Sequence, residues 1–410
     1  MPENLKPAIT SLVKALKKEG KNRLATAISK NWRKTLLEYS KTINSYRPGA
    51  PMEKIFKKAI GKELLRLRYP IHKRREIIKS LEHRRILQTT PHISPAGKPR
   101  FFFINWLNSL SLGKQDFFPV AMFSGVPFSN KTRPGRLCRK EGDINLIPSN
   151  MQDELVYRNK IPEKMVTVIA GLPSKLKKFL PKAKVGESYT AWALKSSKII
   201  EGKFLHGKPV FFDFNEVASN YLLLAIRDPK HPISKIFFSD KERKMTIRNF
   251  KEMVFFYAPV KKGKEKEYEE TESFFLKDGF LESPSCKISL DPETLARELK
   301  GRLCPGLITG FFIFSFLNHF QCLGSFAQIE YLPLYRDKFA KFPFLKKYNI
   351  KKSKAGLTTG GFPFDVNLHV LDVALGEKFA PNENALFGEA LLAIKDVLLH
   401  QNYSMNLVRK

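Results

Sequence analysis

The sequence predicts an α/β protein with a mostly parallel, Rossmann-like sheet and helices on both faces, preceded by a basic helical N-terminal region. Apolar residues recur at helical spacing over 5–45 and 51–87. From about residue 88, short Phe-rich apolar runs alternate with helix-like stretches, which is typical of a parallel sheet with covered faces. The 410 residues are 43% hydrophobic, enough to bury a substantial core.

The first predicted region, residues 1–87, is strongly basic. Two helical stretches are separated by YRPGAP (46–51), whose Pro and Gly interrupt a helix. Residues 1–90 contain 23 Lys and Arg against 7 Asp and Glu, in a chain of net charge +33. This predicts non-specific contact with nucleic acid or an acidic surface through residues 1–90; a solvated basic face is the alternative.

Residues 88–260 form the predicted α/β core. Its apolar runs, read as strands, are 117–123, 165–170, 209–214, 235–239 and 253–258. The stretches between them that favour helix are 151–159, 173–181, 186–199 and 215–226. A charged insertion follows at 261–288, where 261–272 is read as a solvent loop or a hairpin.

Residues 289–410 are predicted to be mainly helical and to complete the core. A helix is expected over 289–301, with Asp291 as N-cap, Pro292 at the first position and Gly301 after its end. Residues 303–323 contain no charge and are long enough to cross a bilayer. Because Asn318, His319 and Gln321 cluster at one end, we interpret them as a buried core helix and expect no transmembrane segment.

The cysteines do not indicate a metal or disulfide framework. The four lie at 138, 286, 304 and 322, with no C-x-x-C pair. His319 and Cys322 would share a helix face, but no further ligand follows at a spacing typical of a metal site, so no metal site is expected.

The N-terminus lacks the apolar core of a signal peptide, so we expect a cytoplasmic protein. Nucleotide, hydrolase and zincin motifs are absent, and the cofactor stays unknown.

The loop after the apolar run 117–123 is the first candidate site. Ligands of open α/β sheets bind at the carboxyl ends of strands, so residues 124–136 are placed to hold one. Ser124, Ser129 and Asn130 offer short hydrogen-bonding side chains. Arg133 and Arg136 are expected to clamp a carboxylate or phosphate; solvated arginines in an ordinary turn are the alternative.

Three further stretches add candidates. Thr89, Thr90 and His92 precede an apolar helix, whose free backbone N–H groups favour anions. Gln328, Glu330 and Tyr331 follow a Gly-Ser break, and we assign proton transfer to His92 or Glu330. The alternatives are a capping histidine and a glutamate paired with an arginine. Thr358 and Thr359 stand before Asp365, a candidate N-cap of a helix that closes at Gly376, and could cradle phosphate.

Two stretches carry a resemblance to a known family. TTPHISPAGKPRFFFINWLNSLSLGKQDFFPVAMFSG and CPGLITGFFIFSFLNHFQCLGSFAQIEYLPLYRDKF, about 70 residues together, resemble segments of the bacillithiol-biosynthesis cysteine-adding enzymes. Where that family has G-P-G-E, residues 324–331 read GSFAQIEY, and Ser124, Ser129 and Asn130 replace its acidic cluster. The family's coiled coil has no clear counterpart. The resemblance implies a Rossmann-like core and a condensing or ligase-type site in a bacterial biosynthetic enzyme.

The function predicted is therefore a cytoplasmic enzyme, a ligase or transferase, acting on a small anionic or amino-acid-like substrate. The rival is a nucleic-acid-binding protein that uses the basic N-terminal helices. A third possibility is a protein docked on a membrane surface by the same face. The substrate, the reaction type and the oligomeric state are not determined by the sequence.

Overall fold

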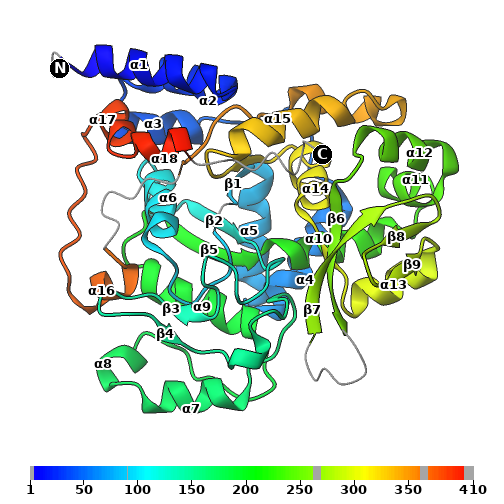
Figure 1. The fold of residues 1–410 in the computed structure, drawn as a ribbon, viewed down its shortest axis with the longest axis horizontal. Helices are drawn as coiled ribbons and strands as arrows, with labels where there is room; N and C mark the ends of the chain where they lie inside the picture. Colours follow the sequence, from blue (N-terminus) through cyan, green and yellow to red (C-terminus); the bar gives the residue numbers. More distant parts are fainter. Residues whose placement is uncertain (1–3, 90, 262–268, 361–367, 401–410) are drawn as a thin grey trace.

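A parallel sheet of four strands, in the order β11-β1-β2-β5, forms the centre of the fold (Figure 1). The computed structural model describes residues 4–89, 91–261, 269–360 and 368–400. Ile86 of β1 lies opposite Gln321 of β11, and Met122 of β2 lies opposite Asp213 of β5. The predicted strands at 117–123 and 209–214 are thereby confirmed, and segments more than 230 residues apart in the chain are neighbours.

A second sheet, in the order β10-β6-β7-β8-β9, is antiparallel. The apolar run at 253–258 lies in strand β6 of this sheet. Strand β6 pairs with β7 as a hairpin, which was one of the two interpretations of residues 261–272. A two-stranded antiparallel pair, β3-β4, completes the strands. The strands are β1 (Ile86–Gln88), β2 (Phe117–Met122), β3 (Arg136–Leu137), β4 (Ile144–Asn145), β5 (Lys208–Asp213), β6 (Val254–Lys261), β7 (Glu269–Leu276), β8 (Phe280–Glu282), β9 (Lys287–Ser289), β10 (Cys304–Pro305) and β11 (Gln321–Leu323).

Helices make up most of the remaining structure. The first nine are α1 (Leu5–Lys18), α2 (Asn22–Asn31), α3 (Leu36–Asn44), α4 (Lys54–Arg66), α5 (Ile71–His83), α6 (Pro99–Ser109), α7 (Glu163–Gly171), α8 (Ser174–Lys177) and α9 (Tyr189–Glu201). The others are α10 (Phe214–Ala225), α11 (Pro232–Phe238), α12 (Asp240–Asn249), α13 (Pro292–Lys300), α14 (Leu307–Phe311), α15 (Gln328–Phe339), α16 (Val370–Leu375), α17 (Phe387–Leu392) and α18 (Lys395–His400). The expected helices over 5–45, 51–87, 186–199, 215–226 and 289–301 are confirmed, and the Asp291 side chain accepts from the Thr294 N–H.

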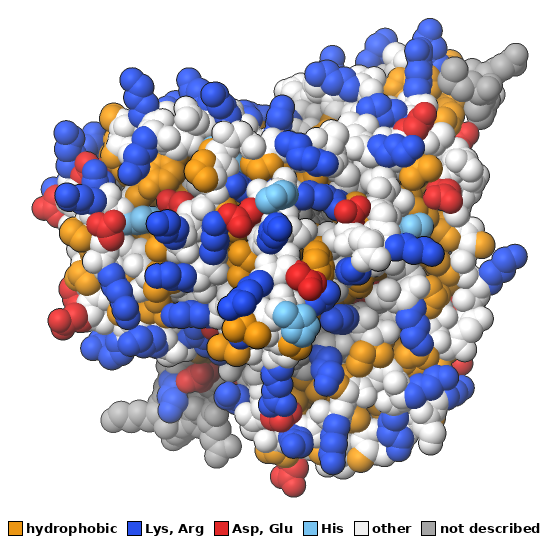
Figure 2. Space-filling view, turned by 180° about the vertical axis from the view of Figure 1, so that it is seen from behind, with side chains coloured by type: hydrophobic (Ala, Val, Ile, Leu, Met, Phe, Trp, Pro, Cys, Tyr) orange, Lys and Arg blue, Asp and Glu red, His pale blue; other side chains and the backbone are white. Residues whose placement is uncertain are grey.

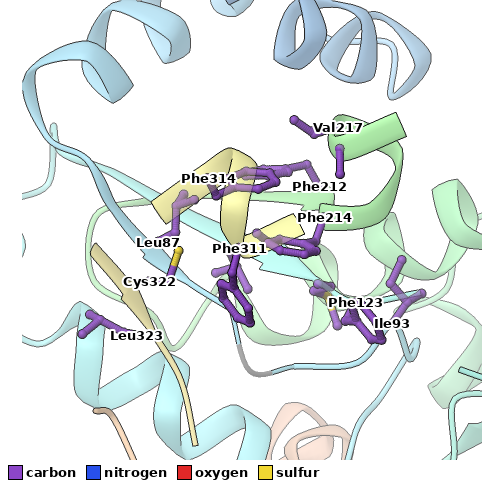
Figure 3. Close-up of a cluster of buried hydrophobic side chains, with 14 of the residues drawn as sticks. Leu87, Ile93, Phe123, Phe212, Phe214, Val217, Phe311, Phe314, Cys322 and Leu323 are labelled. Carbon is purple, nitrogen blue, oxygen red and sulfur yellow. The ribbon is translucent and has the colours of Figure 1, made fainter. Parts of the chain in front are cut away.

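Two groups of helices pack on the parallel sheet. One contains α6 and α9, which are joined by a 2.7 Å hydrogen bond from Asn105 to Glu201. The other contains α4, α10 and α14, and its aromatic side chains meet those of the strands in the core (Figure 3). There the rings of Phe214 and Phe314 stack with their centroids 4.5 Å apart.

Four expected elements are wrong. Residues 165–170 and 235–239, predicted as strands, lie in α7 and α11, where buried residues recur three and four positions apart. Pro162 and Pro232 mark the starts of these helices, a cue that outweighs β-rich composition. Residues 151–159 form turns that bond back to 126–129 instead of a helix, and the helix in 173–181 is only the four residues of α8.

Residues 303–323 are buried, as predicted, but they are not one helix. The short helix α14 continues as a single π-helical segment, Phe312–Leu317, and the chain then enters β11. Within the described ranges, no helix is long and apolar enough to span a membrane.

Candidate functional site

A cavity of about 540 Å³ lies at the carboxyl ends of β11, β1 and β2. Thr89 follows β1, Phe123 follows β2, and Ser325 stands just after β11; all three line the cavity. This is the edge at which open α/β sheets hold ligands. Of the sequence-predicted site residues, Thr89, His92, Gln328 and Tyr331 line the cavity together.

His92 is positioned by an extension of the sheet. Residues 91–93 continue alongside β2: the Phe123 N–H donates to Pro91 O and the Ile93 N–H donates to Phe123 O, at 2.8 and 3.0 Å. The imidazole of His92 packs near the rings of Phe101 and Phe123, with centroids 5.9 and 5.7 Å away. Backbone pairing and ring packing together fix its orientation.

Hydrogen bonds determine which nitrogen of His92 carries the proton. The Thr132 backbone N–H can only donate, and it lies 3.0 Å from Asn130 Oδ1, so this atom is an acceptor. The Thr132 hydroxyl donates to the same oxygen at 2.8 Å, and its own oxygen therefore accepts from His92 Nδ1, 2.9 Å away. The proton is thus held on Nδ1, and Nε2 is left with a free lone pair.

The surroundings of His92 disfavour its charged form. The pKa of His92 is lowered to about 4, by burial first and by the Arg100 cation second, while the Asn130 side chain opposes the shift. The imidazole is therefore neutral at pH 7 in the free protein. An anion bound beside Arg100 would offset that cation and raise the pKa of His92.

Two cations stand at the start of α6, on the wall of the cavity. Lys98 is the N-cap of the helix and Arg100 follows Pro99. Burial lowers the pKa of both side chains, and for Lys98 the Arg133 and Arg100 cations add to the effect. Among the described residues neither makes an ion pair, and no Asp or Glu lines the cavity.

The first turn of α6 contains no acidic residue. Cations at the positive end of a helix are electrostatically unfavourable. A bound anion would reverse that penalty, because it would be attracted by both side chains and by the positive end of the helix dipole.

Thr89 and Gln328 are held against each other across the cavity floor. The Thr89 hydroxyl lies 3.2 Å from Gln328 Oε1 and 3.1 Å from Leu323 O, and Gln328 Nε2 donates to Cys322 O at 2.9 Å. Gly324 makes this possible, since a Cβ there would lie 1.7 Å from Gln328 Oε1. Glycine at position 324 therefore allows the Gln328 amide to lie against the end of β11.

Aromatic rings form much of the remaining wall: Phe101, Phe123, Phe326 and Tyr331. Burial raises the pKa of Tyr331 well above its ordinary value, so its hydroxyl remains protonated and able to donate a hydrogen bond. The cavity therefore combines a cationic side at α6 with a flat apolar side.

Glu330 does not belong to this site. Its carboxylate accepts from the Leu24 backbone N–H at 2.8 Å and lies 4.0 Å from Arg23 Nη1. Glu330 therefore caps the start of α2 and pairs with an arginine, which was the alternative to a role in proton transfer. With Glu330 elsewhere, the cavity lacks a described carboxylate for the ammonium group of an amino-acid-like substrate.

Arg133 and Arg136 do not line the cavity either. Both guanidinium groups pair with Asp143, Arg133 directly and Arg136 at 3.9 Å. Their charge is partly offset within the loop, and both side chains are about 40% exposed or more. The expected clamp on a ligand in this cavity is therefore not formed by these two residues.

The hydroxyls of the 124–136 loop are engaged by the protein. Ser124 is fully buried, and its hydroxyl donates to Asp213 Oδ1 at 2.8 Å. Ser129 binds Asp153 at the surface. Asn130 contributes to the site indirectly, since it orients Thr132 and hence His92.

The predicted phosphate cradle is closed by internal hydrogen bonds. The Thr358 hydroxyl donates to Gly324 O, and the Thr359 hydroxyl accepts from Gln88 Nε2 at 3.1 Å. Both side chains are buried, so they tie residues 358–360 to the end of β11. Thr90 and Asp365 lie outside the described residues, whereas Gly376 ends α16 with a positive φ, as expected.

Sequence reasoning missed Lys98, Arg100 and Thr132. A usable signal was present in GKPRFFF, where two cations flank a proline at the start of an apolar helix. That arrangement breaks the charge preference of helix ends, and such local conflicts mark functional sites. No comparable signal pointed to Thr132.

Comparison with known proteins adds no relative. No family model matches the chain, and no curated protein or solved structure matches it.

Proposed function

We propose that this protein is an enzyme that binds a small anionic substrate in the cavity at the ends of β11, β1 and β2, and that His92 accepts a proton during the reaction. One observation carries the proposal. His92, with its proton held on Nδ1 by Thr132, lines the same cavity as Lys98 and Arg100, with which no described carboxylate forms an ion pair.

The cavity wall supports a substrate of two parts. Lys98 and Arg100 suit a carboxylate or phosphate, which they would bind through charge-assisted hydrogen bonds. The rings of Phe101, Phe123 and Phe326 suit a flat apolar group. A volume of about 540 Å³ suits a metabolite of small to moderate size.

The chemistry proposed for His92 is general base catalysis. A bound anion raises its pKa from about 4 toward neutrality, where a base is most effective. His92 Nε2 then removes the proton of a hydroxyl, thiol or amine that attacks the substrate. Deprotonation of a nucleophile is the step that transferases and condensing enzymes share, and we place the protein in that class.

Two finer proposals accompany this function. The parallel strand order and the two helical groups support a Rossmann-like sheet covered on both faces. The condensing chemistry is also what the resemblance to the cysteine-adding enzymes implies. We also propose that the protein is cytoplasmic.

Binding of simple aromatic anions tests the cavity. Isothermal titration calorimetry with benzoate and phenyl phosphate should detect binding, and the uncharged analogue benzamide should bind at least tenfold more weakly. The variant K98M/R100Q should lose about 100-fold or more in affinity for the anions, since each of the two charge-assisted bonds contributes about 1.5–3 kcal/mol. A control variant, K164M/K175M, removes the same charge from exposed positions on α7 and α8 and should bind as the wild type does.

The protonation of His92 supplies an independent readout. NMR titration should place its pKa near 4 in the free protein and higher with phenyl phosphate bound. Equal affinity for benzoate and benzamide, or equal losses in both variants, would remove the basis for an anionic substrate. A pKa of His92 that does not respond to the ligand would remove it as the base.

A further inference from the structure

A second cavity, of about 810 Å³, lies between the N-terminal helices and α15. Its wall combines α2, the end of α3 with the turn after it, α15, and the segment 354–357. These segments come from opposite ends of the chain, so the hollow exists only in the folded protein. Of the described residues, none lines both this cavity and the one that contains His92.

The charges on this wall are all of one sign. Its basic residues are Arg23, Lys30, Arg47, Arg336 and Lys354, and no Asp or Glu stands among the described lining residues. A concave surface lined by one sign of charge focuses the field and concentrates counter-ions. The high overall charge of the protein provides a background, but the wall gathers five cations around one hollow.

Few acidic groups stand close enough to offset these cations. Arg23 and Arg336 both pair with Asp337, at 3.6 and 2.9 Å, and Arg23 also lies 4.0 Å from the Glu330 carboxylate. Two carboxylates outside the wall therefore serve two of the five cations. Arg47 donates to the backbone carbonyls of Asn44 and Tyr46.

Lys30 and Lys354 are exposed and form no ion pair within the part of the chain that the structure describes. The wall therefore has a surplus of positive charge, and it would be stabilised by a ligand with several negative charges.

We propose that this cavity binds a compact molecule that carries two or more phosphate groups. Guanidinium forks and lysine ammonium groups are the usual partners of phosphate oxygens. The cations surround a bounded hollow whose volume is that of a small-molecule site.

A single-stranded nucleic acid requires a continuous groove with several aromatic platforms for its bases. Among the described lining residues only Tyr46 is aromatic. The wall therefore favours a compact polyphosphate over a nucleic-acid strand.

Calorimetry on the full chain at 150 mM salt tests this site with inorganic probes. Tripolyphosphate should bind at least tenfold more tightly than orthophosphate, because more cations are engaged at once. The variant K30M/K354M should lose about 100-fold or more in tripolyphosphate affinity, at roughly tenfold or more for each charge-assisted contact. The matched control K18M/K352M removes the same charge from exposed neighbours that do not line the cavity, and its affinity should fall less than threefold.

Three results would overturn the proposal. The first is no difference between tripolyphosphate and orthophosphate, and the second is an equal loss in both double variants. The third is tighter binding of a 20-nucleotide RNA than of tripolyphosphate, with the same dependence on Lys30 and Lys354, which would make this wall part of a nucleic-acid surface. The variant K98M/R100Q should leave tripolyphosphate binding unchanged, so the two sites are tested separately.

Discussion

At the scale of single residues, Glu201 opposes folding when it is ionised. Its side chain is buried, and burial raises its pKa to about 7, although a hydrogen bond from Asn105 Nδ2 lowers it in part. The folded state therefore holds a proton that the unfolded chain releases near pH 4.5. Stability from this group is complete below pH 4.5 and is lost as the pH rises to about 7.

The variant E201Q should remove this pH dependence. We expect it to be more stable than the wild type at pH 8, by up to about 3 kcal/mol, and nearly equal to it at pH 4.5. The glutamine amide can also donate to Asn105 Oδ1, which is buried without a partner among the described residues. Urea unfolding at the two pH values measures the difference.

Exposed Glu19 provides the control, since E19Q should change stability by little at either pH. A variant E201Q that is less stable than the wild type at pH 8 would contradict the burial argument.

Residue-level prediction from the sequence worked where polar side chains stand next to a break in the apolar pattern. Thr89 and His92 were found because they precede an apolar helix, and Gln328 and Tyr331 because they follow a glycine break; all four line the cavity. Glu330 failed for a geometric reason. Residues 328 and 331 are three apart on α15 and share a face, whereas residue 330 points to the opposite face, toward α2.

At the scale of elements, the turn from β11 into α15 holds the cavity floor. Alanine at Gly324 would place its Cβ inside the Gln328 amide. Gln328 would have to leave its contacts with Thr89 and Cys322 O. We expect G324A to cost about 1–3 kcal/mol of stability, as overpacking does, and to weaken phenyl phosphate binding about tenfold. Thermal unfolding and calorimetry measure the two effects.

Gly49 offers a matched control, because a Cβ there meets no atom within 4 Å. The variant G49A should retain the stability and binding of the wild type. If G324A binds phenyl phosphate normally, the Gln328 amide is not part of the ligand site.

Elements were predicted well where capping residues were used together with the apolar pattern, and poorly where the apolar run alone decided the assignment. α13 was placed by Asp291, Pro292 and Gly301. α7 and α11 were missed because a short apolar run fits a buried strand and a buried helix equally. The partner of a strand was beyond sequence reasoning, since nothing local in 321–323 indicates that it pairs with 86–88.

At the scale of the whole molecule, the basic N-terminal helices belong to the core. Lys and Arg side chains are scattered over the face shown in Figure 2, and α1 buries its apolar residues Leu5, Ile9, Leu12 and Leu16. α1 packs on α17 and α18, and Lys21 Nζ donates to the carbonyls of Leu398 and Leu399. The boundary drawn at residue 87 is therefore crossed by many contacts.

Removal of residues 1–45 should abolish cooperative folding. Each large apolar side chain lost from the core costs about 1.5–3 kcal/mol, and α1 alone contributes four, against a typical total stability of 5–15 kcal/mol. Differential scanning calorimetry should show no single transition for chain 46–410. The variant K6Q/K14Q/K17Q/K18Q retains the apolar face of α1 and should unfold in one transition. A cooperative transition in the deletion would show that the helices are dispensable.

The order of strands in the parallel sheet also constrains how the chain can be made. β1 lies between β2 and β11, yet β11 is separated from it by more than 230 residues. During translation β1 and β2 therefore emerge long before the strand that completes their sheet. Throughout that interval the nascent protein has an unpaired apolar edge, which is a template for aggregation. Slow synthesis through residues 90–320 would lengthen that exposure, and chaperones that bind extended apolar segments would be needed most in that interval.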